Sequence, residues 1–253
     1  MRYLFFIALS FFLLNCKNDV KQDVSEENET AQHIIDKSIE VSGGEVIYNS
    51  KIEFDFRDVN YKAIRNDGTF SLTRITVDGN TRIVDSLSND GFDRKVNDEI
   101  IEIPDSMALK YSASVNSVHY FSMLPFGLND EAVQKELLPP VTINDKDYQT
   151  IKVTFKEDGG GEDFEDVFFY WIDKKTNKLA YLAYSFAEED GMGLRFREAF
   201  NERFVNGVRF VDYNNYKPMD KSIKLTDLPE YFNDDKLELL SKIELKNISV
   251  TPI

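Results

Sequence analysis

The sequence has little of what cross-linked and metal-dependent folds require. Its 253 residues include one cysteine and two histidines. A single cysteine excludes an intrachain disulfide framework and a zinc–thiolate cluster, and two histidines give little basis for a histidine-rich metal site. The chain also lacks the P-loop, GxGxxG and GxSxG motifs. Nothing in it therefore supports nucleotide binding through those motifs or an α/β-hydrolase.

Basic residues are scarce relative to acidic ones. The chain has 30 lysines and arginines against 45 aspartates and glutamates, which gives a formal net charge of −15. Because a nucleic-acid backbone requires a basic face, this balance excludes nucleic acid as a partner. Hydrophobic residues make up 42% of the chain and aromatic residues 13%, a composition typical of a globular protein.

The amino terminus carries an almost unbroken hydrophobic run, Leu4–Leu14, after a basic second residue. A transmembrane helix needs about 20 residues, so this run is too short and has instead the length of a signal-peptide core. It ends in the letters LLNC, which resemble the lipobox of bacterial lipoprotein signals. The resemblance implies cleavage before Cys16 and lipidation of this cysteine, which would attach the protein to a membrane.

The same resemblance predicts where the protein lies and how the chain is divided. Lys17 stands where an aspartate would signal retention at the inner membrane. We therefore expect outer-membrane anchoring, on the periplasmic face or at the cell surface. The predicted divisions are a signal peptide over residues 1–15, a disordered polar tether over 16–30 and a single β domain over 31–253.

Hydrophobic spacing predicts helices and strands along this domain. Residues 31–42 have one apolar helical stripe, with Thr30 as N-cap and a glycine pair at the end. Alternating residues then predict antiparallel strands joined by short turns, including the pair Asn206-Gly207. Two helices, over residues 105–124 and 130–138, are predicted to interrupt the strands. The segment VFFYWID is apolar on both faces, so both faces need packing partners.

This order of elements resembles the lipoprotein-carrier fold of the LolA, LolB and LppX group. Two local phrases carry the resemblance: the helix ending in a glycine pair, HIIDKSIEVSGG, and a strand running into Asp173-x-x-Thr176-x-x-Leu179. The outline is also similar to that of an uncharacterised family of Gram-negative lipoproteins. The resemblance implies a mainly β (α+β) fold, in which a curved antiparallel sheet forms an incomplete barrel. Two or three helices would plug that barrel around an apolar cavity.

Aromatic residues are abundant, with 20 phenylalanines, 12 tyrosines and one tryptophan. Eight of them lie on elements expected to face the space between sheet and helices, and they are candidates for binding an acyl chain or another hydrophobic ligand. These are Phe54, Phe56, Phe121, Phe168, Tyr170, Trp171, Tyr184 and Phe196. The same side chains would equally form a filled core. The sequence therefore leaves the choice between a cavity and a core open.

An acidic, glycine-rich loop lies between two predicted strands, where residues 156–166 read KEDGGGEDFED. Glu157, Asp158, Glu162 and Asp163 are a candidate site for calcium, which prefers about six to eight oxygen ligands. The spacing does not match an EF-hand, and a solvated hairpin is the alternative. Because successive hairpin connections alternate between the ends of a meander, residues 187–193 should share this end and complete an acidic rim.

Together these features favour an outer-membrane lipoprotein, not an enzyme, that binds a lipid or other hydrophobic ligand between sheet and helices. One alternative is a surface lipoprotein with a filled core that contacts a protein partner through the acidic rim. Another is an enzyme with an unrecognised carboxylate site, which would need carboxyl groups whose pKa values are pushed apart by burial. Apart from calcium, no cofactor is expected.

Overall fold

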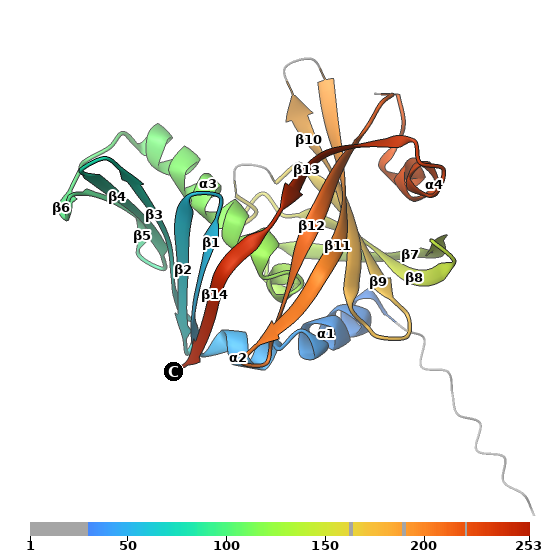
Figure 1. Ribbon diagram of the computed structural model, residues 1–253, viewed down its shortest axis with the longest axis horizontal. Coiled ribbons are helices and arrows are strands. Elements are labelled where there is room, and N and C mark those ends of the chain that lie inside the picture. Colours follow the sequence, from blue (N-terminus) through green and yellow to red (C-terminus); the bar gives the residue numbers. More distant parts are fainter. Residues whose placement is uncertain (1–29, 162–163, 189–190, 221) are drawn as a thin grey trace, which may run out of the picture.

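Two antiparallel sheets dominate the computed structural model, which describes residues 30–161, 164–188, 191–220 and 222–253 (Figure 1). In spatial order the first sheet contains β14 (Leu245–Pro252), β1 (Ser50–Phe56), β2 (Val59–Asn66), β3 (Thr69–Asp78), β4 (Thr81–Ser88), β5 (Gly91–Val96) and β6 (Glu99–Ile100). The second contains β13 (Leu237–Ile243), β12 (Val208–Pro218), β11 (Gly191–Val205), β10 (Leu179–Glu188), β9 (Val167–Asp173), β8 (Lys146–Phe155) and β7 (Val133–Ile143). The predicted mainly β class is confirmed, and the strands form an open, antiparallel arrangement that does not close into a barrel, divided over two sheets where a single curved sheet was expected.

Few helices accompany the sheets within the described ranges. They are α1 (Ala31–Val41), α2 (Gly44–Tyr48), α3 (Asp105–Ser122) and α4 (Leu228–Asn233), with the 3₁₀ turns η1 (Phe126–Asn129) and η2 (Leu225–Asp227). In the part of the chain that the structure describes, no helix has both the length and the apolar character needed to cross a membrane. The helix predicted at residues 105–124 is confirmed as α3.

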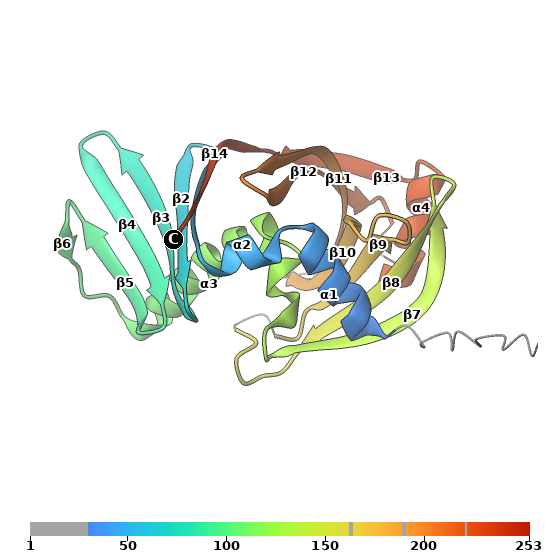
Figure 2. The same ribbon diagram turned by 90° about the horizontal axis from the view of Figure 1, so that it is seen from below.

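The first helix covers the inner face of the second sheet. As predicted, Thr30 is its N-cap, and the Thr30 hydroxyl accepts a hydrogen bond of 3.1 Å from the backbone N–H of His33. Ile34 and Ile35 are buried and belong to the same cluster as Ile151 of β8. Figure 2 shows α1 lying within the curve of the second sheet. The apolar stripe of the sequence therefore closes one side of this sheet.

The two sheets meet where β13 passes into β14 after a single residue. The buried carboxylate of Asp212 accepts hydrogen bonds from the backbone N–H of Leu245, at 3.0 Å, and from the Arg203 guanidinium, at 2.8 Å. The same guanidinium donates to the carbonyl oxygen of Leu245 at 2.8 Å. A charged pair thus satisfies the backbone of Leu245 at the point where the chain changes sheets.

The third helix crosses from the first sheet to the second (Figure 1). Over the first sheet, Asp85 is buried and accepts hydrogen bonds from Arg74 and Arg94. Arg74 also donates to the Ser114 hydroxyl of α3 at 2.7 Å, and the Arg94 guanidinium lies 3.6 Å from the ring centroid of Tyr111. Burial raises the pKa of Asp85, but the hydrogen bonds from both arginines outweigh it and hold that pKa below its ordinary value. This ion cluster fixes α3 on the sheet.

The second predicted internal helix, over residues 130–138, is wrong, because the chain there enters β7. β7 pairs with β8 in an antiparallel ladder that runs from Val133 opposite Phe155 to Ile143 opposite Lys146. The ladder shifts register between Leu138 and Val141, which is where the two prolines lie. Proline lacks an N–H donor and is tolerated at bulges and in edge strands. β7 is an edge strand.

Both faces of the second sheet are packed. On the inner face, Tyr170 and Leu182 join the cluster that includes α1. On the outer face, Trp171, Tyr181 and Phe196 form a separate cluster with Leu228 of α4. Because successive side chains of a strand point to opposite faces, the apolar sequence VFFYWID contributes to two clusters at once.

Candidate ligand-binding cavity

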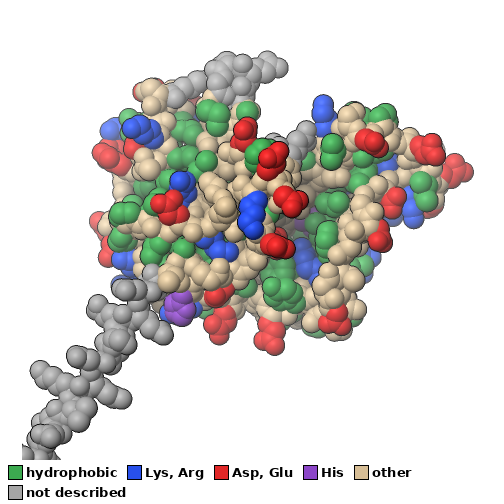
Figure 3. Space-filling view, turned by 180° about the vertical axis from the view of Figure 1, so that it is seen from behind, with side chains coloured by type: hydrophobic (Ala, Val, Ile, Leu, Met, Phe, Trp, Pro, Cys, Tyr) green, Lys and Arg blue, Asp and Glu red, His purple; other side chains and the backbone are tan. Residues whose placement is uncertain are grey.

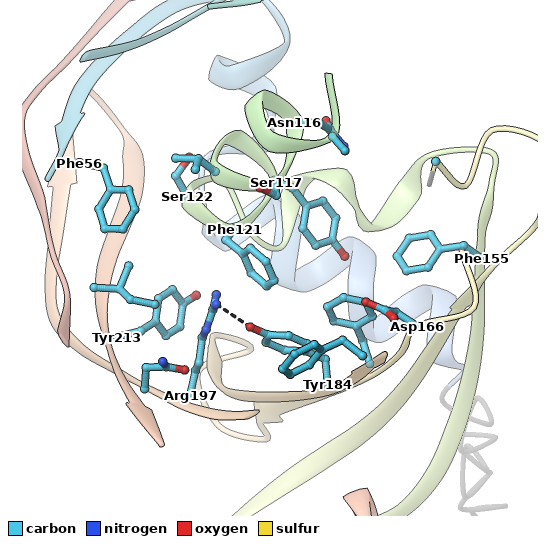
Figure 4. A pocket seen from close by; sticks show the side chains of 18 of the residues that line it. Phe56, Asn116, Ser117, Phe121, Ser122, Phe155, Asp166, Tyr184, Arg197 and Tyr213 are labelled. Carbon is cyan, nitrogen blue, oxygen red and sulfur yellow. Dashed lines mark hydrogen bonds between the residues drawn. The ribbon is translucent and has the colours of Figure 1, made fainter. Parts of the chain in front are cut away.

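A cavity of about 910 Å³ lies between α3, the inner face of the second sheet and the loop before β9 (Figure 4). Its walls come from β1, α3, β8 to β14 and the connections between them. The exposed lining residues are Arg57, Asn116, Ser117, Gly161, Glu165, Ala187 and Met192. These residues form the mouth, and the volume lies within the range of about 300–1,000 Å³ common for small-molecule sites.

The face opposite to that of Figure 1 is hollowed between the parts of the molecule that contain the two sheets (Figure 3). Hydrophobic and basic side chains are visible in the hollow, and acidic side chains stand around it. Among the cavity-lining residues, Glu165 and Asp166 carry this acidic character to the mouth. The rim is therefore negative, while the walls behind it are largely apolar.

Aromatic rings form one wall of the cavity. Phe168 lies at the centre of this group, with ring-centroid distances of 5.2 Å to Tyr184, 5.7 Å to Phe155 and 6.2 Å to Phe121. These separations are those of stacked and edge-to-face pairs in protein cores. The rings thus support one another and leave open space beside them.

Two tyrosine hydroxyls meet behind this wall. The hydroxyl oxygens of Tyr120 and Tyr170 are 2.6 Å apart, so one donates a hydrogen bond to the other. Burial raises the pKa of Tyr120 and of Tyr170 above their ordinary value, as it does the pKa of Tyr213. All three phenols therefore stay neutral at physiological pH, and they supply hydroxyl groups without charge.

A polar row crosses the floor of the cavity on neighbouring strands. Arg197 of β11 is opposite Asn215 of β12, which is opposite Ser241 of β13. The Arg197 guanidinium donates to the hydroxyl of Tyr184 at 2.8 Å and lies 4.0 Å from the ring centroid of Phe121. Figure 4 shows Arg197 reaching between the labelled aromatic residues. The floor therefore combines one cation with neutral polar groups.

Comparison with known proteins assigns a family. The sequence matches, over residues 8–245, a family whose description is "Family of unknown function (DUF6503)". The chain belongs to this family. None of the curated proteins matches the chain in sequence.

Solved structures similar to this DUF6503 chain include a LolA superfamily protein, NE2245, from Nitrosomonas europaea. It is 12% identical, with 88% of this chain and 92% of that chain covered and a TM-score of 0.46. An outer-membrane lipoprotein-sorting protein domain from Vibrio parahaemolyticus is also 12% identical, over 80% of this chain and 99% of that chain, with a TM-score of 0.40. The lipoprotein LppX of Mycobacterium tuberculosis is 11% identical, over 61% of this chain and 86% of that chain, with a TM-score of 0.28. Likeness at this level concerns the outline of the fold and says nothing about ligands.

The structure of this DUF6503 member brings four of the eight predicted aromatic residues to the cavity. Phe56, Phe121, Phe168 and Tyr184 line it, and Figure 4 shows three of them by label. Tyr170 lies directly behind, where its hydroxyl contacts that of Tyr120. The predicted location beside the space between sheet and helix therefore holds for Phe168, Tyr170 and Tyr184 of the second sheet, for Phe121 of α3 and for Phe56 at the end of β1.

The other three predicted aromatics lie away from the cavity. Phe54 is fully buried in the cluster of the first sheet, with its ring 5.5 Å from that of Tyr61. Trp171 and Phe196 lie on the outer face of the second sheet, where the Phe196 ring is 4.8 Å from that of Phe232. For Trp171 and Phe196 the expectation that they face the space between the sheet and α3 is wrong, because both fall on the opposite parity of their strands. Phe54 does face α3, with its ring 5.8 Å from that of His119, but it packs in the core of the first sheet and not at the cavity.

The candidate calcium residues are not gathered in the described part of the loop. Glu157 and Asp158 are exposed, and Glu162 and Asp163 lie outside the described residues. Among the residues that the structure describes, no group of three or more potential metal-ligating side chains occurs. As predicted, the loop before β9 and the β10–β11 connection share one end of the sheet, since Val167 is opposite Ser185. Cys16 also lies outside the described residues.

The polar floor was not predicted from the sequence. In the strand LRFREAF the arginines alternate with apolar residues, which is the usual pattern of a solvent-facing side. Arg197 and Asn215 instead face the cavity. One sequence signal could have identified them. The alternating strand LRFREAF follows strands that are apolar on both faces, so its polar side chains lie on a face that its neighbours make apolar. A polar residue on such a face points either to water or into a cavity.

Proposed function

We propose that this protein is a lipoprotein of the outer membrane, anchored through Cys16, that binds a lipid or another hydrophobic ligand between the second sheet and α3. The observation that carries the proposal is the cavity of about 910 Å³ with aromatic walls. Close packing is the usual state of a protein core, so a space of this size favours a ligand site over a filled core.

The chemistry of the walls supports an apolar chain as the bound part of the ligand. Phe121, Phe155 and Phe168 offer ring faces and edges to the space, and Val211 and Ile243 add aliphatic surface. Each buried CH₂ group contributes about 0.8 kcal/mol of binding free energy. An acyl chain placed along these rings therefore gains affinity in proportion to its length.

Native mass spectrometry tests the proposal. The full chain carrying Cys16→Ser, to which no acyl group can be attached at the only cysteine, is purified and transferred to buffer without detergent. We expect an added mass of a few hundred daltons that is lost after organic extraction. The extracted protein should then bind added palmitate or hexadecanol, because both carry a long apolar chain.

A variant that fills the cavity provides the control. Ala113 of α3 lines the space, so Ala113→Trp should weaken binding of these probes by about tenfold or more while the fold persists. Leu109→Trp on the same helix is the matched control, because Leu109 is exposed and lies outside the cavity. If the extracted wild-type chain binds no acyl probe at all, the proposed function is wrong.

A further inference from the structure

Arg197 is the feature of the cavity that an apolar ligand alone does not explain. Its side chain is buried, with 8% of the residue exposed, and a guanidinium stays protonated at physiological pH. Burying a charge without a counter-charge is unfavourable. The contacts of Arg197 should therefore show which group balances it.

The observed contacts of Arg197 are neutral. One terminal nitrogen donates to the Tyr184 hydroxyl, and the guanidinium plane lies near the rings of Phe121 and Tyr184. Its Nε atom is buried and has no hydrogen-bond acceptor among the described residues. Within the same ranges, no carboxylate forms an ion pair with it. The balancing charge is therefore not supplied by the described part of the chain.

Other arginines of this protein provide the comparison. Arg209 on the neighbouring strand is equally buried, with 7% exposed, and forms an ion pair with Glu202. Arg94 pairs with Asp85 in the same way. The chain thus neutralises these arginines with its own carboxylates, whereas Arg197, the buried one of the two arginines that line the cavity, has none among the described residues.

We propose that the ligand is an amphiphile with an anionic head group and that Arg197 binds this head while the acyl chain lies along the aromatic wall. The inference rests on the proposed function and specifies its ligand class. A guanidinium presents paired N–H donors that match a carboxylate or a phosphate. Asn215, whose side-chain oxygen is buried without a donor among the described residues, and Ser241 add neutral polar groups beside it.

The distribution of charges around the cavity determines which end of the bound amphiphile lies beside Arg197. Glu165 and Asp166 lie at the loop side of the cavity, and Figure 4 places Asp166 beyond Tyr184 from Arg197. An anionic head would be repelled by these carboxylates and attracted by Arg197. The head therefore binds at the floor beside β11 and β12, and the chain extends past Phe121 towards Phe155.

The test compares probes that share a chain and differ in head charge. Dissociation constants of palmitate and hexadecanol are measured at neutral pH for the full chain carrying Cys16→Ser. Palmitoyl lysophosphatidic acid and monopalmitoylglycerol form a second pair, which distinguishes a phosphate head from a carboxylate head. We expect one or both anionic probes to bind about tenfold or more tightly than their neutral partners, because a charge-assisted hydrogen bond is gained.

Substitution of the arginine should remove this preference. Arg197→Met replaces the guanidinium with an uncharged side chain, and this variant should bind the acid and the alcohol within about twofold of each other. Arg197→Lys should keep part of the preference. Arg82→Met, which removes the same charge from the distant strand β4, should keep all of it.

The outcomes separate this inference from the proposed function. Equal binding of each anionic probe and its neutral partner by the Cys16→Ser chain with Arg197 intact overturns the inference and leaves the proposed function standing. Absence of binding for all four probes overturns both. Because the comparison of probes on the Cys16→Ser chain needs no substitution in the cavity, it decides the inference even if Arg197→Met does not fold.

Discussion

His119 is a buried titratable residue whose protonation affects the stability of the fold. It lies in α3, is 1% exposed, and its Nε2–H donates to the backbone carbonyl of Thr73 at 3.1 Å. Its ring stands edge-on to those of Phe54 and Tyr61. Its second nitrogen has no partner among the described residues. Burial lowers the pKa of His119 to about 4 from an ordinary value of 6.5.

This shift predicts a loss of stability in acid. Between about pH 6.5 and pH 4 the unfolded chain binds a proton at residue 119 and the folded chain does not, so the free energy of unfolding falls as the pH falls. The difference between 6.5 and about 4 corresponds to about 3 kcal/mol at most. Urea unfolding at neutral pH and at about pH 4.5 measures it.

Variants isolate the contribution of this histidine. His119→Gln keeps a donor for the Thr73 carbonyl but does not titrate, so it should lose less stability than the wild type on the same acidification. His33→Gln is the matched control, because His33 is exposed on α1, and it should behave as the wild type does. An equal loss in the wild type and in both variants would contradict this account.

At the level of residues, the sequence predicted which side chains are buried better than it predicted the face of the sheet on which each one lies. The aromatic residues of β9 were correctly expected to be buried, and Phe168 indeed lines the cavity. Trp171, three positions on, faces α4 instead. In a strand that is apolar on both faces, alternation separates the two sets but does not say which set meets the helices. That choice is made by α4, whose position depends on tertiary contacts.

Among the elements, the hairpin strands were predicted well, whereas the strand β7 was predicted as a helix. Asn206-Gly207 joins β11 to β12 with both residues at positive φ, as the turn chemistry predicted. The apolar residues of 130–138 do not alternate strictly, and the prediction of a helix there is wrong. Ladder pairing with β8 decides their conformation, and local spacing carries no information about such a distant partner.

The contact between the α1–α2 junction and the β11–β12 turn predicts a large effect for one glycine. Gly43 has φ +83°, and a Cβ atom there would lie 2.2 Å from the carbonyl oxygen of Gly207. The backbone N–H of Arg209 also donates to the carbonyl of Ser42 at 3.0 Å, so the two segments are held together. Gly43→Ala should therefore lower the free energy of unfolding through both the left-handed conformation and the clash.

Gly68 provides the matched control for this prediction. It has φ +81°, and nothing lies within 4 Å of a Cβ built on it. Gly68→Ala should cost about 1–2 kcal/mol for the conformation alone, and Gly43→Ala about 1–3 kcal/mol more for the clash. Urea unfolding of both variants measures the difference. Equal costs would mean that the junction and the turn are not in contact.

For the whole molecule, the sequence predicted the class of fold but did not decide between a cavity and a filled core. The open form of the sheet was implied by the family resemblance, and the antiparallel strands and the helix α3 follow from periodicity and turn residues. The space beside the aromatic wall does not, because its existence depends on how far α3 stands from the sheet. Two sets of contacts of α3 determine that separation. One is the ion cluster around Asp85 on the first sheet, and the other is the packing of Phe121 against Phe168 of the second sheet. Both involve residues distant in sequence.

The proposed anchor is independent of the cavity and gives the last prediction. Attachment of lipid at Cys16 would hold the protein on a membrane, since each buried CH₂ contributes about 0.8 kcal/mol and more than one acyl chain makes residence stable. Cells of a bacterial host given labelled palmitate should incorporate the label into the wild-type protein, which should sediment with membranes. Because Cys16 is the only cysteine, Cys16→Ser leaves no other thiol and should abolish both results.

The same variant shows whether anchor and cavity act separately. The described residues that line the cavity run from Phe56 to Leu245, so Cys16→Ser should bind acyl probes as tightly as the lipidated protein does after transfer to detergent-free vesicles. A variant that loses the label but remains in the membrane fraction would contradict anchoring through Cys16. A variant that leaves the membrane and also loses its affinity for the probes would mean that the acyl groups on Cys16 contribute to the binding site. The proposed independence of anchor and cavity would then be wrong.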